Sequence, residues 1–169
     1  MRITNPTHLR NLAQALDQTT HRLPPSADAL AQGEGLLRYI DEAVIEVNWI
    51  LAQLSGELHL SYHGKTERPP SDSHDRRATA ISSCAAPLGT ALSRLGKVMD
   101  RLSALHPVLG PRVIDADVVG SADLLRPLHR DIAGARTAMR RAAKQFRLNA
   151  DRLDHPAVGA SRQVAPEAR

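Results

Sequence analysis

The chain has 169 residues, which suits a single domain, and 42% of them are hydrophobic, which is enough to build one core. Only 2% are aromatic, so the core must come from Leu, Ile, Val and Ala, and this composition favours close helix–helix packing over a sheet. The formal charge of +4 permits binding to a nucleic acid or an acidic partner without requiring it, and the one cysteine excludes an internal disulfide.

Apolar residues recur at alternating spacings of three and four in four segments, which is the heptad pattern of helices that pack side by side. The first helix is expected over about 5–23, because Asn5 is a preferred N-cap residue and Pro6 suits the first helical position. Pro24 and Pro25 end this segment. Its predicted core row is Leu9, Leu12, Leu16, Thr19 and Leu23.

The second helix is expected over about 27–61 and carries the longest unbroken apolar series. That series runs through Leu30, Gly33, Leu37, Ile40, Val44, Val47, Leu51, Leu54 and Leu58. The following stretch, about 62–73, is polar and rich in Pro, Ser and Gly, so it is predicted to be a mobile loop.

The third helix is expected over about 74–106, with His106 and Pro107 at its end. Pro87 lies inside the pattern and removes a backbone donor, which predicts a bend near Ser83. Cys84 falls in a core row, where burial would keep its thiol protonated and inert. The three predicted rows are Ile81, Leu88, Leu95 and Leu102; Cys84, Ala91, Val98 and Leu105; and Ala85, Leu92 and Met99.

The fourth helix is expected over about 122–154. Its rows are Leu125, Ile132, Met139, Phe146 and Leu153, and Leu128, Ala135, Ala142 and Asn149. Together the segments predict an all-α, antiparallel four-helix bundle with a short first helix, a single domain over 1–155 and a disordered tail over 156–169. An extended coiled-coil hairpin that completes its core by dimerisation is the alternative, and periodicity does not separate the two.

The sequence lacks the motifs of common bundle metal sites, of nucleophilic catalysis and of nucleotide binding. Ferritin-like di-iron bundles need Glu-x-x-His on two helices, and no glutamate of the second helix is followed by histidine at that spacing. His59 and His63, four residues apart, are weak candidates for zinc ligands because no further ligand motif completes the set. Nucleophile-elbow, dinucleotide and phosphate-loop motifs are also absent. We therefore expect no cofactor and no catalytic residues, with a metal-dependent bundle enzyme as the third hypothesis.

The fourth helix carries a row of basic residues at positions that face away from its core rows. Its stretch 126–152 has a net charge of +6, whereas 28–57 in the second helix has a net charge of −5. The basic row could bind phosphates of a nucleic acid without sequence preference, or it could pair with the acidic edge of a neighbouring second helix. We call the following residues the basic stripe: Arg126, Arg130, Arg140, Arg141, Lys144 and Arg147.

A smaller candidate surface lies on the back of the second helix, where Ile45, Trp49 and Ala52 point away from its apolar series. A tryptophan beside an aliphatic residue is typical of an interaction anchor. The competing interpretation is that the first helix folds over these residues and buries them.

The sequence favours a non-catalytic helical-bundle protein that acts through protein–protein contacts, as an adaptor, regulator or assembly subunit. A homodimer or a stable complex with another protein is expected. The alternative is an accessory nucleic-acid-binding protein that uses the basic stripe. No window is apolar enough to span a membrane and the start lacks the apolar part of a secretory signal, so we expect a cytoplasmic location, in a bacterium if the predominance of Arg over Lys reflects a high-GC genome.

Overall fold

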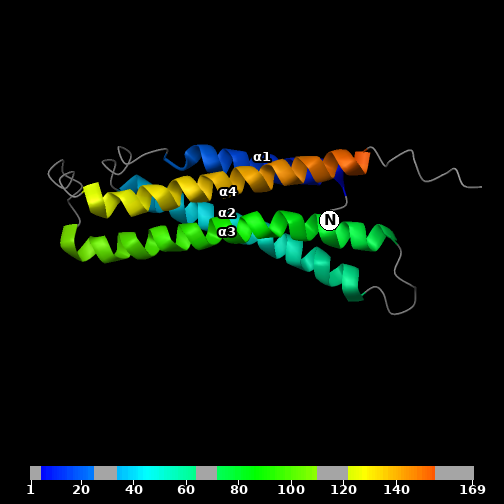
Figure 1. Ribbon diagram of the computed structural model, residues 1–169, viewed down its shortest axis with the longest axis horizontal. Helices are drawn as coiled ribbons and strands as arrows, with labels where there is room; N and C mark the ends of the chain where they lie inside the picture. Colours follow the sequence, from blue (N-terminus) through cyan, green and yellow to red (C-terminus); the bar gives the residue numbers. More distant parts are fainter. Residues whose placement is uncertain (1–4, 25–33, 64–71, 110–121, 155–169) are drawn as a thin grey trace, which may run out of the picture.

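The computed structural model describes residues 5–24, 34–63, 72–109 and 122–154. They form four helices that lie side by side in an elongated bundle (Figure 1). The predicted all-α four-helix bundle with a short first helix is therefore confirmed. Most of the predicted loop and the whole predicted tail lie outside the described residues. The helices are α1 (Pro6–Arg22), α2 (Glu34–His63), α3 (Asp72–Leu109) and α4 (Ala122–Asp154).

Helix α1 begins as the sequence predicts. The Asn5 side chain accepts a hydrogen bond of 2.9 Å from the backbone N–H of Thr7, and Pro6 occupies the first helical position. At the other end, the backbone N–H of Leu23 donates to the carbonyl of Thr19. These bonds satisfy backbone groups that have no partner within the helix.

Helix α3 ends later than predicted, at Leu109 instead of about residue 106, because the helix continues through Pro107. A proline lacks its own backbone donor, but the residues after it keep theirs. Helix α4 also contains a proline, Pro127, within its first two turns. The predicted start of α2 near residue 27 lies outside the described residues.

Helix α4 packs against α3 and α1, and α2 packs against the same two helices from the other side. Consequently α2 and α4 lie diagonally across the bundle. Residues later in α1 contact residues earlier in α4, so these two helices run in opposite directions, as Figure 1 shows. The partners are Arg10 with Asp151 and Asp154, Asp17 with Arg147, and Leu23 with Arg136.

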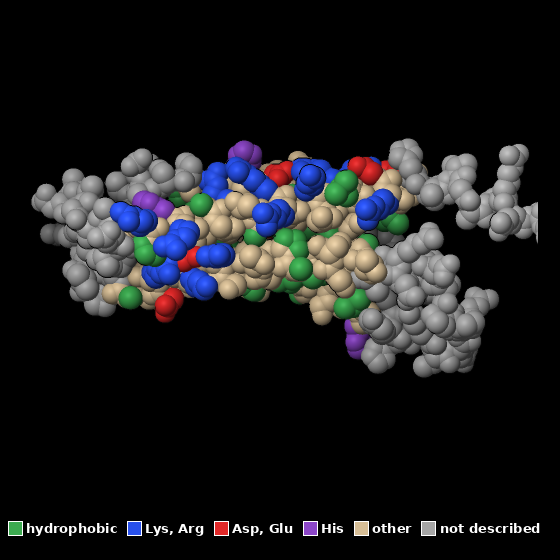
Figure 2. Space-filling model, in the orientation of Figure 1, with side chains coloured by type: hydrophobic (Ala, Val, Ile, Leu, Met, Phe, Trp, Pro, Cys, Tyr) green, Lys and Arg blue, Asp and Glu red, His purple; other side chains and the backbone are tan. Residues whose placement is uncertain are grey.

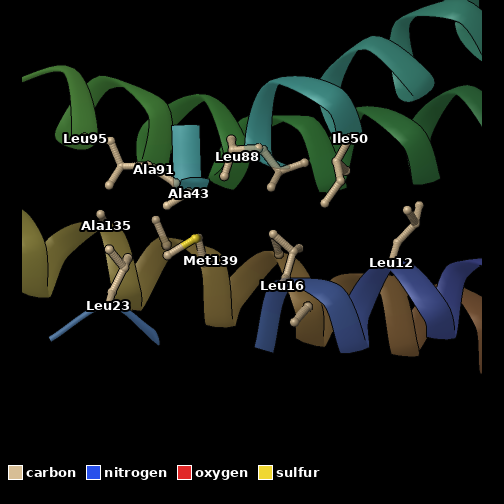
Figure 3. Packing of buried hydrophobic residues seen from close by; sticks show 14 of the residues in the cluster. Leu12, Leu16, Leu23, Ala43, Ile50, Leu88, Ala91, Leu95, Ala135 and Met139 are labelled. Atoms are coloured by element: carbon tan, nitrogen blue, oxygen red, sulfur yellow. The ribbon is translucent and has the colours of Figure 1, made fainter. Parts of the chain in front are cut away.

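The core is built from Leu, Ile, Val and Ala, with Phe146 as its largest fully buried side chain. Figure 3 shows Met139 and Leu16 pointing into the space between the helices, toward residues of α2 and α3. Small side chains on α4 let its two neighbouring helices, α1 and α3, approach it closely. These buried alanines are Ala135, Ala138, Ala142, Ala143 and Ala150.

The buried row of α2 differs from the predicted series at every second position. Ile40, Val47 and Leu54 are buried as expected, but the row is completed by Leu36, Ala43 and Ile50. The sequence predicted Leu37, Val44 and Leu51 there, and Leu37 is 47% exposed while the other two are half-buried. Because apolar residues stand side by side at all three places, either register gives an unbroken pattern, and packing against α1 and α3 selects one.

At the ends of the bundle the predicted rows extend beyond the core. Leu153 is 41% exposed, although it continues a row whose members Ile132, Met139 and Phe146 are buried. Met99 is 37% exposed, and the other members of its row, Ala85 and Leu92, are only half-buried. A row is buried only along the length over which a neighbouring helix covers it.

The α2 register can be tested with two adjacent substitutions. Ile50→Ala should reduce the free energy of unfolding by about 2–5 kcal/mol, because it leaves a cavity in a fully buried site. Leu51→Ala should cost clearly less, since Leu51 lies at the edge of the core. Urea unfolding of both variants measures the difference, with the exposed Leu37→Ala as a control. A larger loss from Leu51→Ala would show that the register with Leu37, Val44 and Leu51 in the core is the correct one.

Candidate functional site

The basic stripe lies on the outward face of α4, and all six of its residues are exposed. Figure 2 shows Lys and Arg side chains distributed along this helix and gathered over the groove that it forms with α3. The stripe does not lie beside α2, so the interpretation that it pairs with the acidic edge of α2 is wrong. The reason is the order of packing, which places α1 and α3 between the two helices.

Helix α1 supplies the partners for one edge of α4. Arg147, a member of the stripe, donates to Asp17, and the half-buried Arg136 donates to the carbonyl of Leu23. Burial, with the positive charge of Arg140, lowers the pKa of Arg136. Exposed ion pairs of this kind contribute about 0–1 kcal/mol each, so they align the two helices more than they stabilise them.

On the opposite edge of α4, a polar cleft of about 430 Å³ opens between α3 and α4. Its floor is Asp131, which is 3% exposed and accepts hydrogen bonds from Arg94, at 2.6 Å, and from Arg101. Arg101 also donates to the carbonyl of Pro127, at 2.9 Å. Lys97, Asp100 and Arg130 complete the lining. We call this feature the α3–α4 cleft.

Local sequence explains why the cleft forms where it does. Arg94 and Arg101 are one heptad apart, so both lie on the side of α3 that faces α4. Gly134, one turn beyond Asp131, leaves room for the Arg94 side chain to lie across α4. A Cβ at this position would be 3.4 Å from Cδ and Nε of Arg94. An alanine here would therefore touch the Arg94 side chain at ordinary van der Waals distance.

The electrostatics of Asp131 are set by its two arginine partners. Burial on its own would raise the pKa of this carboxyl, but hydrogen bonds and charge from Arg94 and Arg101 outweigh it and hold the pKa below its usual value. The side chains of Arg94 and Arg101 are 39% and 38% exposed, so water still reaches both guanidinium groups. Asp131 is therefore an ionised, buried anchor for two cations that remain accessible.

The cluster of Arg94, Arg101 and Asp131 is not among the sites that the sequence predicts. The available signals were the spacing of Arg94 and Arg101, and an aspartate at 131 among the buried positions of α4. A charged residue that falls within an apolar face requires a partner of opposite charge. The helix that provides this partner is set by which helices pack against α4, and the sequence pattern does not reveal that packing order.

On α2, the three residues of the predicted contact surface are all exposed. Ile45 is 60% exposed, Trp49 is 48% exposed, and Ala52 lies next to them on the outer face. The interpretation that α1 buries these residues is wrong, because Ile45 and Trp49 keep about half of their surface exposed, and α1 makes its larger contact with α4. We call the row Ile45, Trp49, Ala52 and Gly56 the α2 outer face.

The remaining candidates can also be placed. His59 is exposed near the end of α2, and His63 is the last residue of that helix. Within the described segments, no three His, Cys, Asp or Glu side chains come together as a possible metal site.

Cys84 is buried as predicted, and burial raises the pKa of its thiol. The amide of Asn149 donates to Cys84 Sγ, at 3.3 Å, and to the carbonyl of Ala80, at 3.1 Å.

The described helices include none with the length and apolar content needed to cross a membrane. No protein-family model matches the chain, and no curated protein and no solved structure is significantly similar to it. Any function must therefore be argued from the surfaces themselves.

Removing the charge of Asp131 tests its role as an anchor. Asp131→Asn should lower the free energy of unfolding by about 1–3 kcal/mol at neutral pH, because the amide carries no charge and keeps only one acceptor oxygen for two arginines that stay accessible to water. The pKa of the Asp131 carboxyl is lower in the folded protein than in the unfolded chain, so the carboxylate stabilises the fold fully at pH values above its unfolded pKa. This stabilisation is lost as the pH falls through the pKa of the folded protein. The deficit of the variant should therefore shrink below about pH 4.

Urea unfolding at neutral and at acidic pH measures both effects. Asp100→Asn is the matched control, since Asp100 lines the same cleft but is exposed. Equal losses in the two variants, or a deficit that grows on acidification, would contradict the anchor role.

Proposed function

We propose that the protein is a non-catalytic helical-bundle protein that acts through protein–protein contacts in the cytoplasm, as an adaptor, regulator or assembly subunit. The observation that supports this proposal is the α2 outer face, where Ile45 and Trp49 are about half exposed at the i and i+4 positions of one helix. Large aromatic and aliphatic residues on an outward face are typical of interaction anchors.

The partner that we propose is a second copy of the chain. Along the α2 outer face, two large residues, Ile45 and Trp49, are followed by two small ones, Ala52 and Gly56. If two α2 helices pair in opposite directions about a twofold axis, Ile45 lies opposite Gly56 and Trp49 lies opposite Ala52. Each large side chain then meets a small one, which is the self-complementarity that an isologous dimer requires.

The local space on α2 agrees with this pairing. A Cβ added to Gly56 would meet no atom within 4 Å, so the backbone there is open to a side chain from a partner. From Ile45 to Gly56 the α2 outer face runs for about 17 Å along the helix. The large and small halves can therefore face each other without involving the α3–α4 cleft.

Light scattering after size exclusion tests the dimer. The parent protein should show twice the chain mass of 18.4 kDa at micromolar concentration. Ile45→Glu removes a large anchor, and Gly56→Leu fills the small half of the face. Both variants should be monomeric and retain their helical circular dichroism, because both positions are exposed. Emission from Trp49, the only tryptophan, should shift to longer wavelength when the dimer dissociates.

Leu148→Glu on α4 is the matched control, since Leu148 is an exposed apolar residue on another helix. This variant should remain dimeric. A parent protein of 18.4 kDa, or a dimer that persists in both α2 variants, would contradict the proposed pairing.

A further inference from the structure

We propose that the α3–α4 cleft binds a phosphoryl group of a phosphate-bearing anion, held by Arg94 and Arg101 with Lys97 and Arg130 at the rim. The cleft lies between α3 and α4, away from the α2 outer face, so this site is independent of the proposed dimer.

The hydrogen-bond donors for such a group are already oriented. Arg94 and Arg101 each use one terminal nitrogen, Nη1, to reach Asp131. A guanidinium has five N–H donors in a fixed planar arrangement, so each arginine keeps donors for a further acceptor. Asp131 restrains both side chains before a ligand arrives, which reduces the entropy lost on binding. Paired guanidinium donors match the geometry of phosphate oxygens.

The charge of the cleft also fits a dianion. Four cations and two carboxylates line it, which leaves a net charge of +2. Lys97 and Arg130 have no carboxylate partner among the described residues. A phosphoryl group carries a charge of about −1.5 to −2 at neutral pH and would neutralise this excess.

The shape of the cleft allows two sources of the phosphoryl group. Its volume of about 430 Å³ is in the range of sites for small molecules. Arg130 belongs to the basic stripe as well as to the cleft, so one phosphate of a nucleic-acid backbone lying along α4 could also occupy it. None of the described lining residues is aromatic, which favours recognition of phosphate over stacking on a base.

A purely structural role for the cluster makes a different prediction. If the cluster serves only to link α3 to α4, the contacts of Asp131 are its whole purpose, and Lys97 and Arg130 are ordinary solvated cations. Variants at Lys97 and Arg130 therefore separate the two roles, because neither side chain bonds to Asp131.

The experiment measures binding to the full-length protein of two probes, pyrophosphate by calorimetry and a short DNA duplex by fluorescence anisotropy. The cleft variant is Lys97→Gln with Arg130→Gln. The matched control is Arg140→Gln with Arg141→Gln, which removes the same charge from exposed positions of α4 outside the cleft. Urea unfolding of both double variants checks that stability is unchanged.

The cleft variant should weaken pyrophosphate binding by about tenfold or more, since charge-assisted hydrogen bonds are lost, while the control should change it by less than about twofold. If the cleft variant and the control both weaken binding of the DNA duplex, the cleft holds one phosphate of a nucleic-acid backbone that lies along α4. If the duplex does not bind, the ligand is a small phosphate-bearing molecule. Equal weakening of pyrophosphate binding by both double variants, or no binding of pyrophosphate to the parent protein, would overturn the proposal.

Discussion

The close packing of α4 against both α1 and α3 is the contact on which the rest of the structure depends. It is possible because α4 presents small side chains on two sides, with Ala135 and Ala142 fully buried between larger residues such as Met139 and Phe146. With α1 and α3 on either side of α4, α2 packs against these same two helices and lies diagonally across from α4. The outward faces of α2 and α4 then point in different directions, one apolar with acidic neighbours and the other basic.

Polar contacts specify how the helices align around this core. Ion pairs at the α1–α4 edge are exposed and contribute little energy, but they occur only in one alignment of the two helices. On the α3–α4 side, Asp131 and Asn149 lie among buried apolar residues and find partners on α3. A shift of α4 by one residue would leave these polar groups without partners, and this cost favours the observed register.

The architecture could be predicted from the sequence because the spacing of apolar residues and the cap at Asn5 are local properties. Two other features could not be predicted. In α2, pairs such as Leu36–Leu37 and Ile50–Leu51 fit two registers equally well, and only the neighbouring helices choose between them. The partners of Asp131 and of the basic stripe depend on which helices touch, and charge totals for whole helices pointed to α2 instead of α1 and α3. The exposure of Trp49 follows from the same packing order.

Cross-linking between helices tests the packing order most directly. In a Cys84→Ser background, one variant carries Asp17→Cys with Arg147→Cys, and the other carries Glu46→Cys with Lys144→Cys. A thiol reagent that spans about one interhelical distance, roughly 8–10 Å, is applied at low protein concentration, and the monomeric product is examined by mass spectrometry. The first variant should form an intramolecular cross-link, because residues 17 and 147 are in contact, and the second should not. Efficient cross-linking of residues 46 and 144 within one chain would contradict the diagonal arrangement of α2 and α4.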